Sequence, residues 1–200
     1  MHEVVVDGLT IMVTDQTYLP AEDTYLMADN MGIEGGETVL DMGTGCGVLA
    51  IIAARKAEKV VAIDINPYAK ACALVNVNLQ NLEDKIDVRQ GYLFNALKSE
   101  EKFDLIMFNP PYLPEGIDLQ NEWLSKAWSG GPKGTEVTEA FLSGVRYHLK
   151  KGGRLLFISS SLSCNDALLN LKQFELSGIV RSVKKLDFET LYLIEARSIL

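Results

Sequence analysis

The sequence predicts an α/β fold, in which a doubly wound, mostly parallel sheet of seven strands follows a short N-terminal β-hairpin. The main observation is that short apolar runs rich in β-branched residues alternate with segments of helical periodicity along most of the chain. A second observation is the lack of repeats, low-complexity tracts and linkers. We therefore expect one domain over residues 1–200, with the hairpin and a helix in residues 1–34 and the core in residues 35–200.

The hairpin is expected from two β-branched runs, residues 3–6 and 9–13, on either side of Asp7-Gly8. The segment from Tyr18 to Thr24 should then lead into a helix whose first turn carries two carboxylates. The strands of the sheet are expected at residues 38–41, 59–65, 86–90, 103–108, 154–160, 179–186 and 190–196. Helices between them are expected at residues 48–57, 68–79, 135–149 and 165–176.

Caps and glycines predict where these helices begin and end. Thr135 or Thr138 would cap the 135–149 helix, and the run Lys150 to Gly153 would end it with cations and a glycine stop. Gly178 would close the next helix. Its inward residues would be Leu168, Leu171 and Phe174. One face of the 68–79 helix carries the apolar residues Ala71, Leu74, Val75 and Leu79.

Composition narrows the classes of function. The chain carries 19 Lys and Arg against 27 Asp and Glu, a net charge of −8, which disfavours general nucleic-acid binding. No run approaches the length of a membrane span, and Met1 to Glu3 lack a basic signal region, so we expect a cytoplasmic protein. The cysteines are scattered, without a Cys-x-x-Cys pair, and are predicted to be free thiols: Cys46, Cys72 and Cys164.

A glycine-rich turn follows the first core strand, in the segment Asp41 to Gly47. It is not the dinucleotide fingerprint, because Val48 stands where the third glycine is needed, and no Gly-Lys-Ser/Thr follows. Asp41 would repel a pyrophosphate but tolerate an ammonium group. Asp64, about 20 residues later at the tip of the next strand, is placed to bind both hydroxyls of a ribose. The alternative is a surface aspartate that caps the following helix.

The run Asn109-Pro-Pro-Tyr112 ends the strand at 103–108. Its prolines cannot donate backbone hydrogen bonds, so the loop displays carbonyls and the Asn109 amide. A planar NH2 group could be held by the Asn109 oxygen and the Pro110 carbonyl while it stacks on Tyr112. The alternative is a plain Pro-Pro turn. Residues 113–134 would then form a lid or substrate-binding segment, or fold onto the body of the protein.

These motifs resemble a known family over almost the whole chain. The turn at Asp41 to Gly47 and the acidic Asp64 resemble the first two motifs of class I S-adenosylmethionine-dependent methyltransferases, which have a Rossmann-like sheet. The Asn109 to Tyr112 loop resembles that of enzymes that methylate planar nitrogens. The segments Tyr18 to Thr24 and Ala127 to Gly131 resemble the HemK family, which methylates the glutamine of the Gly-Gly-Gln loop in peptide chain release factors.

The resemblance implies S-adenosylmethionine as cofactor, S-adenosylhomocysteine as product, and no metal. Cofactor-binding residues would be Thr24, Asp41, Gly43, Gly45, Asp64, Tyr92, Leu93 and Asn109. Residues around the acceptor would be Asn109, Pro110, Pro111 and Tyr112, of which Asn109, Pro110 and Tyr112 are the catalytic candidates. The chain departs from the family at Tyr92, where relatives usually have an aspartate that contacts adenine.

The resemblance also implies partners. Bacterial members have an extra N-terminal helical domain, for which we expect no room here, and the chain looks like the short eukaryotic and archaeal type. That type works with a small zinc-binding activator protein of the Trm112 type. Three alternatives stay open: methylation of the exocyclic amine of adenine in DNA, methylation of a protein lysine, and a non-catalytic cofactor-binding subunit.

Overall fold

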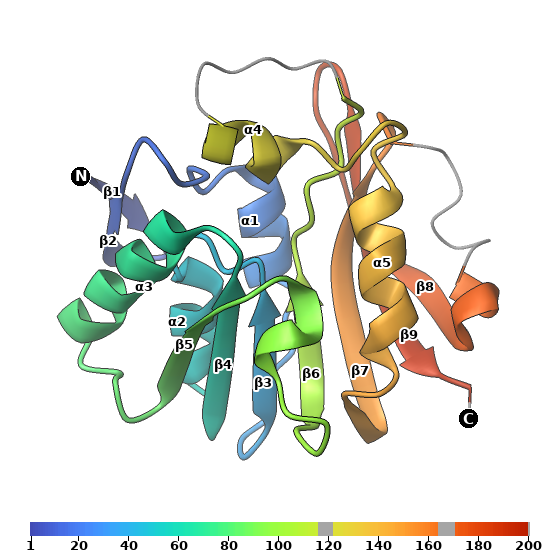
Figure 1. The fold of residues 1–200 in the computed structure, drawn as a ribbon, viewed down its shortest axis with the longest axis horizontal. Coiled ribbons are helices and arrows are strands. Elements are labelled where there is room, and N and C mark those ends of the chain that lie inside the picture. The colour runs from blue at the N-terminus through green and yellow to red at the C-terminus, as the bar shows by residue number, and fades with distance from the viewer. Residues whose placement is uncertain (116–121, 164–170, 200) are drawn as a thin grey trace.

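The computed structural model describes residues 1–115, 122–163 and 171–199. It contains a seven-stranded sheet with helices packed on both faces and a separate two-stranded hairpin (Figure 1). Across the sheet, the strands are β5 (Ile86–Gln90), β4 (Lys59–Asp64), β3 (Thr38–Met42), β6 (Phe103–Phe108), β7 (Leu149–Ser160), β9 (Thr190–Ser198) and β8 (Leu176–Lys185). The predicted fold class is therefore confirmed.

The five strands from β5 to β7 are parallel, whereas β9 is antiparallel to both of its neighbours. The hairpin consists of β1 (His2–Val6) and β2 (Leu9–Val13). The helices are α1 (Glu22–Ala28), α2 (Val48–Ala54), α3 (Pro67–Leu79), α4 (Glu122–Trp128) and α5 (Glu136–Val145), with 3₁₀ turns η1 (Leu93–Ala96) and η2 (Leu171–Phe174). None of the described helices combines the length and apolar character needed to cross a membrane.

Successive residues of the central strands alternate between two separate cores. Val39 belongs to the core under α1, α2 and α3, whereas Leu40 belongs to the core under α5. Leu105 and Ile106 of β6 divide in the same way. Since side chains of a strand point alternately to opposite faces, nearly continuous apolar strands are required in a sheet that is covered on both sides.

Asn76 of α3 attaches the hairpin to the sheet domain. Its side chain is fully buried and pairs with both backbone groups of Met12 in β2, accepting from N–H at 2.7 Å and donating to C=O at 2.8 Å. The same amide donates to the carbonyl of Cys46 at 2.8 Å. One side chain therefore satisfies three backbone groups in two segments that are distant in the sequence.

The predicted helix at 135–149 is too long. It ends at Val145, and Leu149 to Gly153 belong to β7. The reason is the close fit of β7 against β6: a Cβ at Gly153 would lie 3.0 Å from the carbonyl oxygen of Phe103. The Lys150 amine binds Asp104 at 2.8 Å. The run Lys150 to Gly153 therefore belongs to the sheet, and its cations and glycines do not end the helix.

The predicted end of the 165–176 helix is also wrong, because Leu176 begins β8 and Gly178 lies inside that strand. A Cβ at Gly178 would lie 2.6 Å from Leu171, which is buried at the start of η2. The glycine thus allows η2 to pack directly on the sheet. The first part of this prediction, with Leu168, and also Cys164 lie outside the described residues. Cys46 and Cys72 are buried free thiols, as predicted.

Helix α3 presents its predicted apolar face to solvent. The exposed residues are Ala71, Leu74, Val75 and Leu79. The buried face carries small or polar residues instead: Ala69, Cys72, Ala73, Asn76 and Val77. A Cβ at Gly47 would lie 3.0 Å from that of Ala73, so only small side chains allow α3 to approach the glycine turn this closely. A larger apolar residue on this face could not be accommodated.

We expect Asn76→Ala to lower the free energy of unfolding by about 2–3 kcal/mol, because it leaves the Met12 N–H and the Cys46 carbonyl without this partner and the Met12 carbonyl with only the Cys72 thiol, at 3.1 Å. Asn78→Ala is the matched control, since Asn78 lies on the exposed face of the same helix. Urea denaturation of both variants measures the effect. Equal stability of the two variants would contradict the attachment role of Asn76.

Candidate active site

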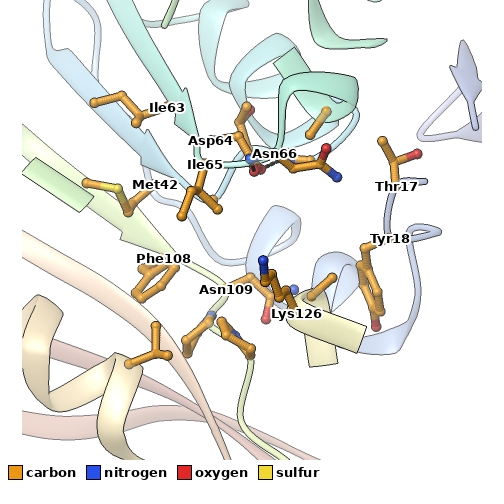
Figure 2. Close-up of a pocket in the computed structure, with 18 of the residues that line it drawn as sticks. Thr17, Tyr18, Met42, Ile63, Asp64, Ile65, Asn66, Phe108, Asn109 and Lys126 are labelled. Atoms are coloured by element: carbon orange, nitrogen blue, oxygen red, sulfur yellow. Dashed lines mark hydrogen bonds between the residues drawn. The ribbon is translucent and has the colours of Figure 1, made fainter. Parts of the chain in front are cut away.

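A cavity of about 340 Å³ opens at the carboxyl ends of β3, β4, β5 and β6, where the chain reverses its direction of progress through the sheet. Figure 2 shows Asp64 and Asn66 across this cavity from Phe108 and Asn109. Most of the residues predicted for the site line it: Thr24, Gly43, Gly45, Asp64, Tyr92, Leu93, Asn109, Pro110, Pro111 and Tyr112. Asp41, the remaining predicted residue, lies beneath Thr44, which does line the cavity.

The glycine turn is held against the neighbouring strand by backbone hydrogen bonds. The N–H of Thr44 donates to the carbonyl of Ile63 at 3.0 Å, and that of Gly45 donates to the Asp64 carboxylate at 2.8 Å. Gly43 has a φ of +67°, and a Cβ there would lie 3.1 Å from the Phe108 ring. Apart from Gly45 itself and its two chain neighbours, no described residue has a heavy atom within 4 Å of a Cβ built on Gly45. The turn is therefore tightly packed at Gly43 and leaves space at Gly45 for a ligand.

Asp41 is a buried carboxylate with one unsatisfied oxygen. The hydroxyl of Thr44 donates to Oδ2 at 2.6 Å, whereas Oδ1 has no hydrogen-bond partner among the described residues. Burial raises the pKa of Asp41 to about 7, although the bond from Thr44 opposes this shift. A positively charged ligand group above the turn would compensate for the burial of this charge.

Asp64 is anchored by backbone groups on both oxygens. Gly45 N–H donates to Oδ2 and Asn66 N–H donates to Oδ1, each at 2.8 Å. Burial raises its pKa, and these hydrogen bonds oppose the shift. Asn66, whose side chain accepts from Tyr68 N–H at 2.9 Å, caps α3 in place of Asp64. This geometry argues against the capping alternative and leaves lone pairs of Asp64 directed at the cavity.

Asn109, which lines the cavity, carries an unsatisfied hydrogen-bond acceptor. Its Oδ1 atom is buried and has no hydrogen-bond partner among the described residues. A buried carbonyl oxygen without a partner is costly, and such a group in a cavity marks a place for a ligand donor. This arrangement differs from a plain Pro-Pro turn, in which the asparagine amide would be solvated or bonded within the loop.

A single carboxylate holds two aromatic side chains beside this loop. Oδ2 of the buried Asp23 accepts from the hydroxyl of Tyr18 at 2.9 Å and from that of Tyr112 at 3.3 Å. Burial, and then the charge of Asp23, raises the pKa of both tyrosines. The Tyr18 ring also contacts Trp128 edge-on, with ring centroids 5.1 Å apart. Tyr112 is thereby fixed in one orientation as a wall of the cavity.

The segment after this loop forms another wall of the cavity. Helix α4 contributes Trp123, Lys126 and Trp128 to the lining. The segment is tied to the loop by the hydrogen bond from Gly130 N–H to the Leu113 carbonyl, at 2.9 Å. A Cβ at Gly130 would lie 2.6 Å from the Pro111 oxygen, so glycine is required for this approach. Of the segment 113–134, residues 123 and 126–129 line the cavity, whereas residues 116–121 lie outside the described range.

Sequence reasoning did not identify three of these residues as part of the site. Tyr18 and Asp23 belong to a segment that was recognised only by resemblance, and their spacing of five residues is not a helical pattern. Trp128 falls in a segment without clear periodicity. Within the residues that the structure describes, no group of three or more His, Cys, Asp or Glu side chains is arranged to hold a metal ion.

Comparison with known proteins finds similarity to methyltransferases in sequence and in structure. Residues 22–127 match the model of the methyltransferase small domain family. The chain is 35% identical to a putative protein N5-glutamine methyltransferase of Methanocaldococcus jannaschii, over 96% of both chains. It is 30% identical to human methyltransferase HEMK2, over 87% of this chain and 86% of the relative. A structure of the E. cuniculi Mtq2-Trm112 complex, described as responsible for methylation of the eRF1 translation termination factor, matches with a TM-score of 0.67. That match has 24% identity and covers 92% of this chain and 99% of the other.

We expect Asp41→Asn to stabilise the ligand-free protein in a pH-dependent way. The folded-state pKa of about 7 exceeds the usual value of 3.8, so the unfolded chain loses its proton first as the pH rises. Asp41 therefore lowers stability progressively from pH 4 to pH 7. The stability difference between the variant and the wild type should grow by about 2–4 kcal/mol between pH 4.5 and pH 8.

Urea denaturation across this pH range measures the difference, and Asp29→Asn, which removes an exposed carboxylate, is the control. A difference for Asp41→Asn that does not change with pH would contradict the burial of its charge.

Proposed function

This chain belongs to the methyltransferase small domain family, and from that premise we propose that it methylates the side-chain amide nitrogen of the glutamine in the Gly-Gly-Gln loop of a peptide chain release factor. It is an S-adenosylmethionine-dependent N-methyltransferase, as predicted. The observation that carries the choice of acceptor is that Asn109 lines the cavity and that its buried side-chain oxygen has no hydrogen-bond partner among the described residues.

The residues of the cavity fit the cofactor. Asp41 has a buried oxygen that no described residue hydrogen-bonds, which suits it to an ammonium group. Asp64 is anchored at the tip of β4, where it suits the two hydroxyls of a ribose, and Gly45 leaves free space beside it. Thr24, Gly43, Tyr92, Leu93 and Asn109 would complete the binding site. When bound, S-adenosylmethionine supplies a methyl group on positively charged sulfur, already activated for transfer.

The acceptor amide is a weak nucleophile because its nitrogen lone pair is delocalised. The Asn109 oxygen and the Pro110 carbonyl would each accept a hydrogen bond from one N–H of the amide. These two hydrogen bonds would orient the lone pair and stabilise the positive charge that develops on nitrogen. Tyr112, held through its hydroxyl by Asp23, would pack against the plane of the amide. Transfer of the methyl group would form the new carbon–nitrogen bond, break the methyl–sulfur bond and leave S-adenosylhomocysteine, and the nitrogen would release one proton to solvent. This scheme requires no strong base in the site.

The choice of a release factor as substrate is supported by the relatives and by charge. The archaeal relative is named as a putative protein N5-glutamine methyltransferase, and the E. cuniculi complex is described as methylating eRF1. A net charge of −8 suits a protein acceptor better than a phosphate backbone. An acceptor of this kind places the enzyme in the cytoplasm.

An activator of the Trm112 type is the second partner that we propose, since the E. cuniculi relative is seen in such a complex. Apolar residues of α3 are exposed next to β5. This strand is at the edge of the sheet, since among the described strands it pairs with β4 alone. An apolar helix face beside an unpaired strand edge offers the activator both apolar contacts and backbone hydrogen bonds.

Adenine methylation is the alternative that this geometry favours most, because an exocyclic amine presents the same planar NH2 group to Asn109 and Pro110. It is disfavoured by the acidic charge of the chain. A lysine amine is not planar and would not use both acceptors, which makes a protein lysine a weaker alternative.

We expect Asn109→Ala to lower the rate of methyl transfer by about 100-fold to 1,000-fold, because one of the two acceptors for the amide is lost. The affinity for S-adenosylmethionine should change far less. Radiolabelled methyl transfer and titration calorimetry measure the two effects, with Asn95→Ala in the exposed part of η1 as control. An equal loss of rate and cofactor affinity would assign Asn109 to cofactor binding alone.

We further expect labelled methyl to appear in a release factor but not in its Gly-Gly-Gln to Gly-Gly-Arg variant, and the activator should increase the yield. Duplex DNA and a lysine-containing peptide are assayed in parallel. Label in DNA or in the lysine peptide alone would replace the glutamine assignment, because each acceptor reports a different nitrogen chemistry.

A further inference from the structure

The turn between β8 and β9 lies at the same end of the sheet as the cavity, beyond the carboxyl ends of the parallel strands. Ser160, the last residue of β7, pairs with Leu191 of β9, so the turn at 186–189 projects beyond the carboxyl ends of the parallel strands. Figure 1 shows this turn at the edge of the sheet that carries α4. The turn therefore lies at the same end of the strands as the cavity, and it has no part in the proposed binding of the cofactor.

Hydrogen bonds fix this turn in place. The hydroxyl of Ser160 donates to the Glu189 carboxylate at 2.7 Å, and the backbone N–H of Thr190 donates to the Ser161 hydroxyl at 2.9 Å. Leu186 N–H closes the turn on the Glu189 carbonyl at 2.8 Å. Because both ends of the turn are held, its tip presents a side chain in a defined position, so little conformational entropy is lost when a partner binds.

That side chain is Phe188, which is 93% exposed. Two further apolar residues are exposed in other segments: Leu19, at 51%, follows the cavity residue Tyr18, and Leu162, at 47%, donates its N–H to the same Ser160 hydroxyl that binds Glu189. We call Leu19, Leu162 and Phe188 the apolar rim. Exposed apolar residues that cluster beside a cavity are typical of a binding surface.

The turn is electrostatically connected to the acceptor side of the cavity. Burial and the Asp23 carboxylate are the main causes of the raised pKa of Tyr18 and Tyr112, and the charge of Glu189 adds to both. The segment that binds Glu189 through Ser160 lies beside Tyr112, because Ser163 and Tyr112 line the same small pocket. The apolar rim borders the acceptor end of the cavity, at a distance along the sheet from the ribose-binding Asp64 on β4.

We propose that the apolar rim binds the polypeptide of the protein acceptor next to the methylated glutamine, with Phe188 seated against an apolar side chain of that polypeptide. The inference rests on the proposed function, since it requires a protein acceptor. A cavity of about 340 Å³ has room for the cofactor and one side chain, so the flanking chain of the acceptor must lie outside it.

Charge favours a polypeptide over a nucleic acid at this surface. Phe188 lies between Asp187 and Glu189, whose carboxylates would repel the phosphates of a nucleic acid. Apolar and aromatic anchors at the centre of a contact are typical of protein–protein recognition. The rim thus adds specificity for the class of acceptor, which the planar amide grip at Asn109 does not supply.

Phe188→Ala tests the inference in the full-length enzyme, with the activator present where activity requires it. The KM for the intact release factor should rise about tenfold, while kcat stays within about twofold and the affinity for S-adenosylmethionine is unchanged. The control is Ile179→Ala, which removes a 64% exposed apolar side chain from the opposite end of the same hairpin. This control should leave KM unchanged.

Titration calorimetry of the release factor into enzyme saturated with S-adenosylhomocysteine gives an independent readout. A Kd that is about tenfold weaker for Phe188→Ala supports the apolar rim, whereas equal Kd and KM values for wild type and variant overturn it. Wild-type enzyme that binds the factor without methylating it would overturn the proposed function, and the Kd comparison would still decide the role of the rim. Wild-type enzyme that does not bind the factor would overturn both.

Discussion

The site depends on one constraint, the burial of carboxylates at the carboxyl ends of the parallel strands. Asp23 is fully satisfied, by two tyrosine hydroxyls and by the N–H of Thr24 at 2.6 Å, and its role is to hold the walls of the cavity. Asp64 is anchored by backbone N–H groups and keeps lone pairs for a ligand. Asp41 keeps one buried oxygen without a described partner. The degree of satisfaction therefore separates structural carboxylates from those that can recognise a cationic, hydroxyl-bearing ligand.

Close backbone approach is what brings these groups together. Glycines occur where a side chain would collide with a neighbouring segment: Gly43 against Phe108, Gly47 against Ala73 and Gly130 against the Pro111 carbonyl. Each contact joins segments that are far apart in the chain, and together they pack the cofactor turn, α3 and the α4 segment around the loop at Asn109. The geometry of the acceptor site is thus supported by the packing of the whole edge of the sheet.

In the proposed function, the acceptor is recognised in two places: by hydrogen bonds at the reacting nitrogen, and by charge and apolar contacts outside the cavity. Asn109 and Pro110 would recognise a planar NH2 group, a feature that glutamine shares with adenine, so this grip alone would not distinguish a protein from a nucleic acid. The surface around the cavity supplies the distinction through its charge and through the apolar side chain of Phe188 at the β8–β9 turn. Specificity thus arises outside the reacting centre, where contacts favour one class of acceptor and repel the other.

The sequence by itself determined which apolar runs form strands and which polar residues stand at the strand tips: Asp41, Asp64 and Asn109, of which Asp64 and Asn109 line the cavity. These features follow from local rules, because strand periodicity and the placement of ligands at parallel strand ends depend on residues close in sequence. Only the tertiary structure decided which face of α3 is buried, where β7 begins, and that Asp23 holds Tyr112, 89 residues away. Such features depend on the shape of the partner surface, and a side chain carries no local signal of the segment against which it will pack.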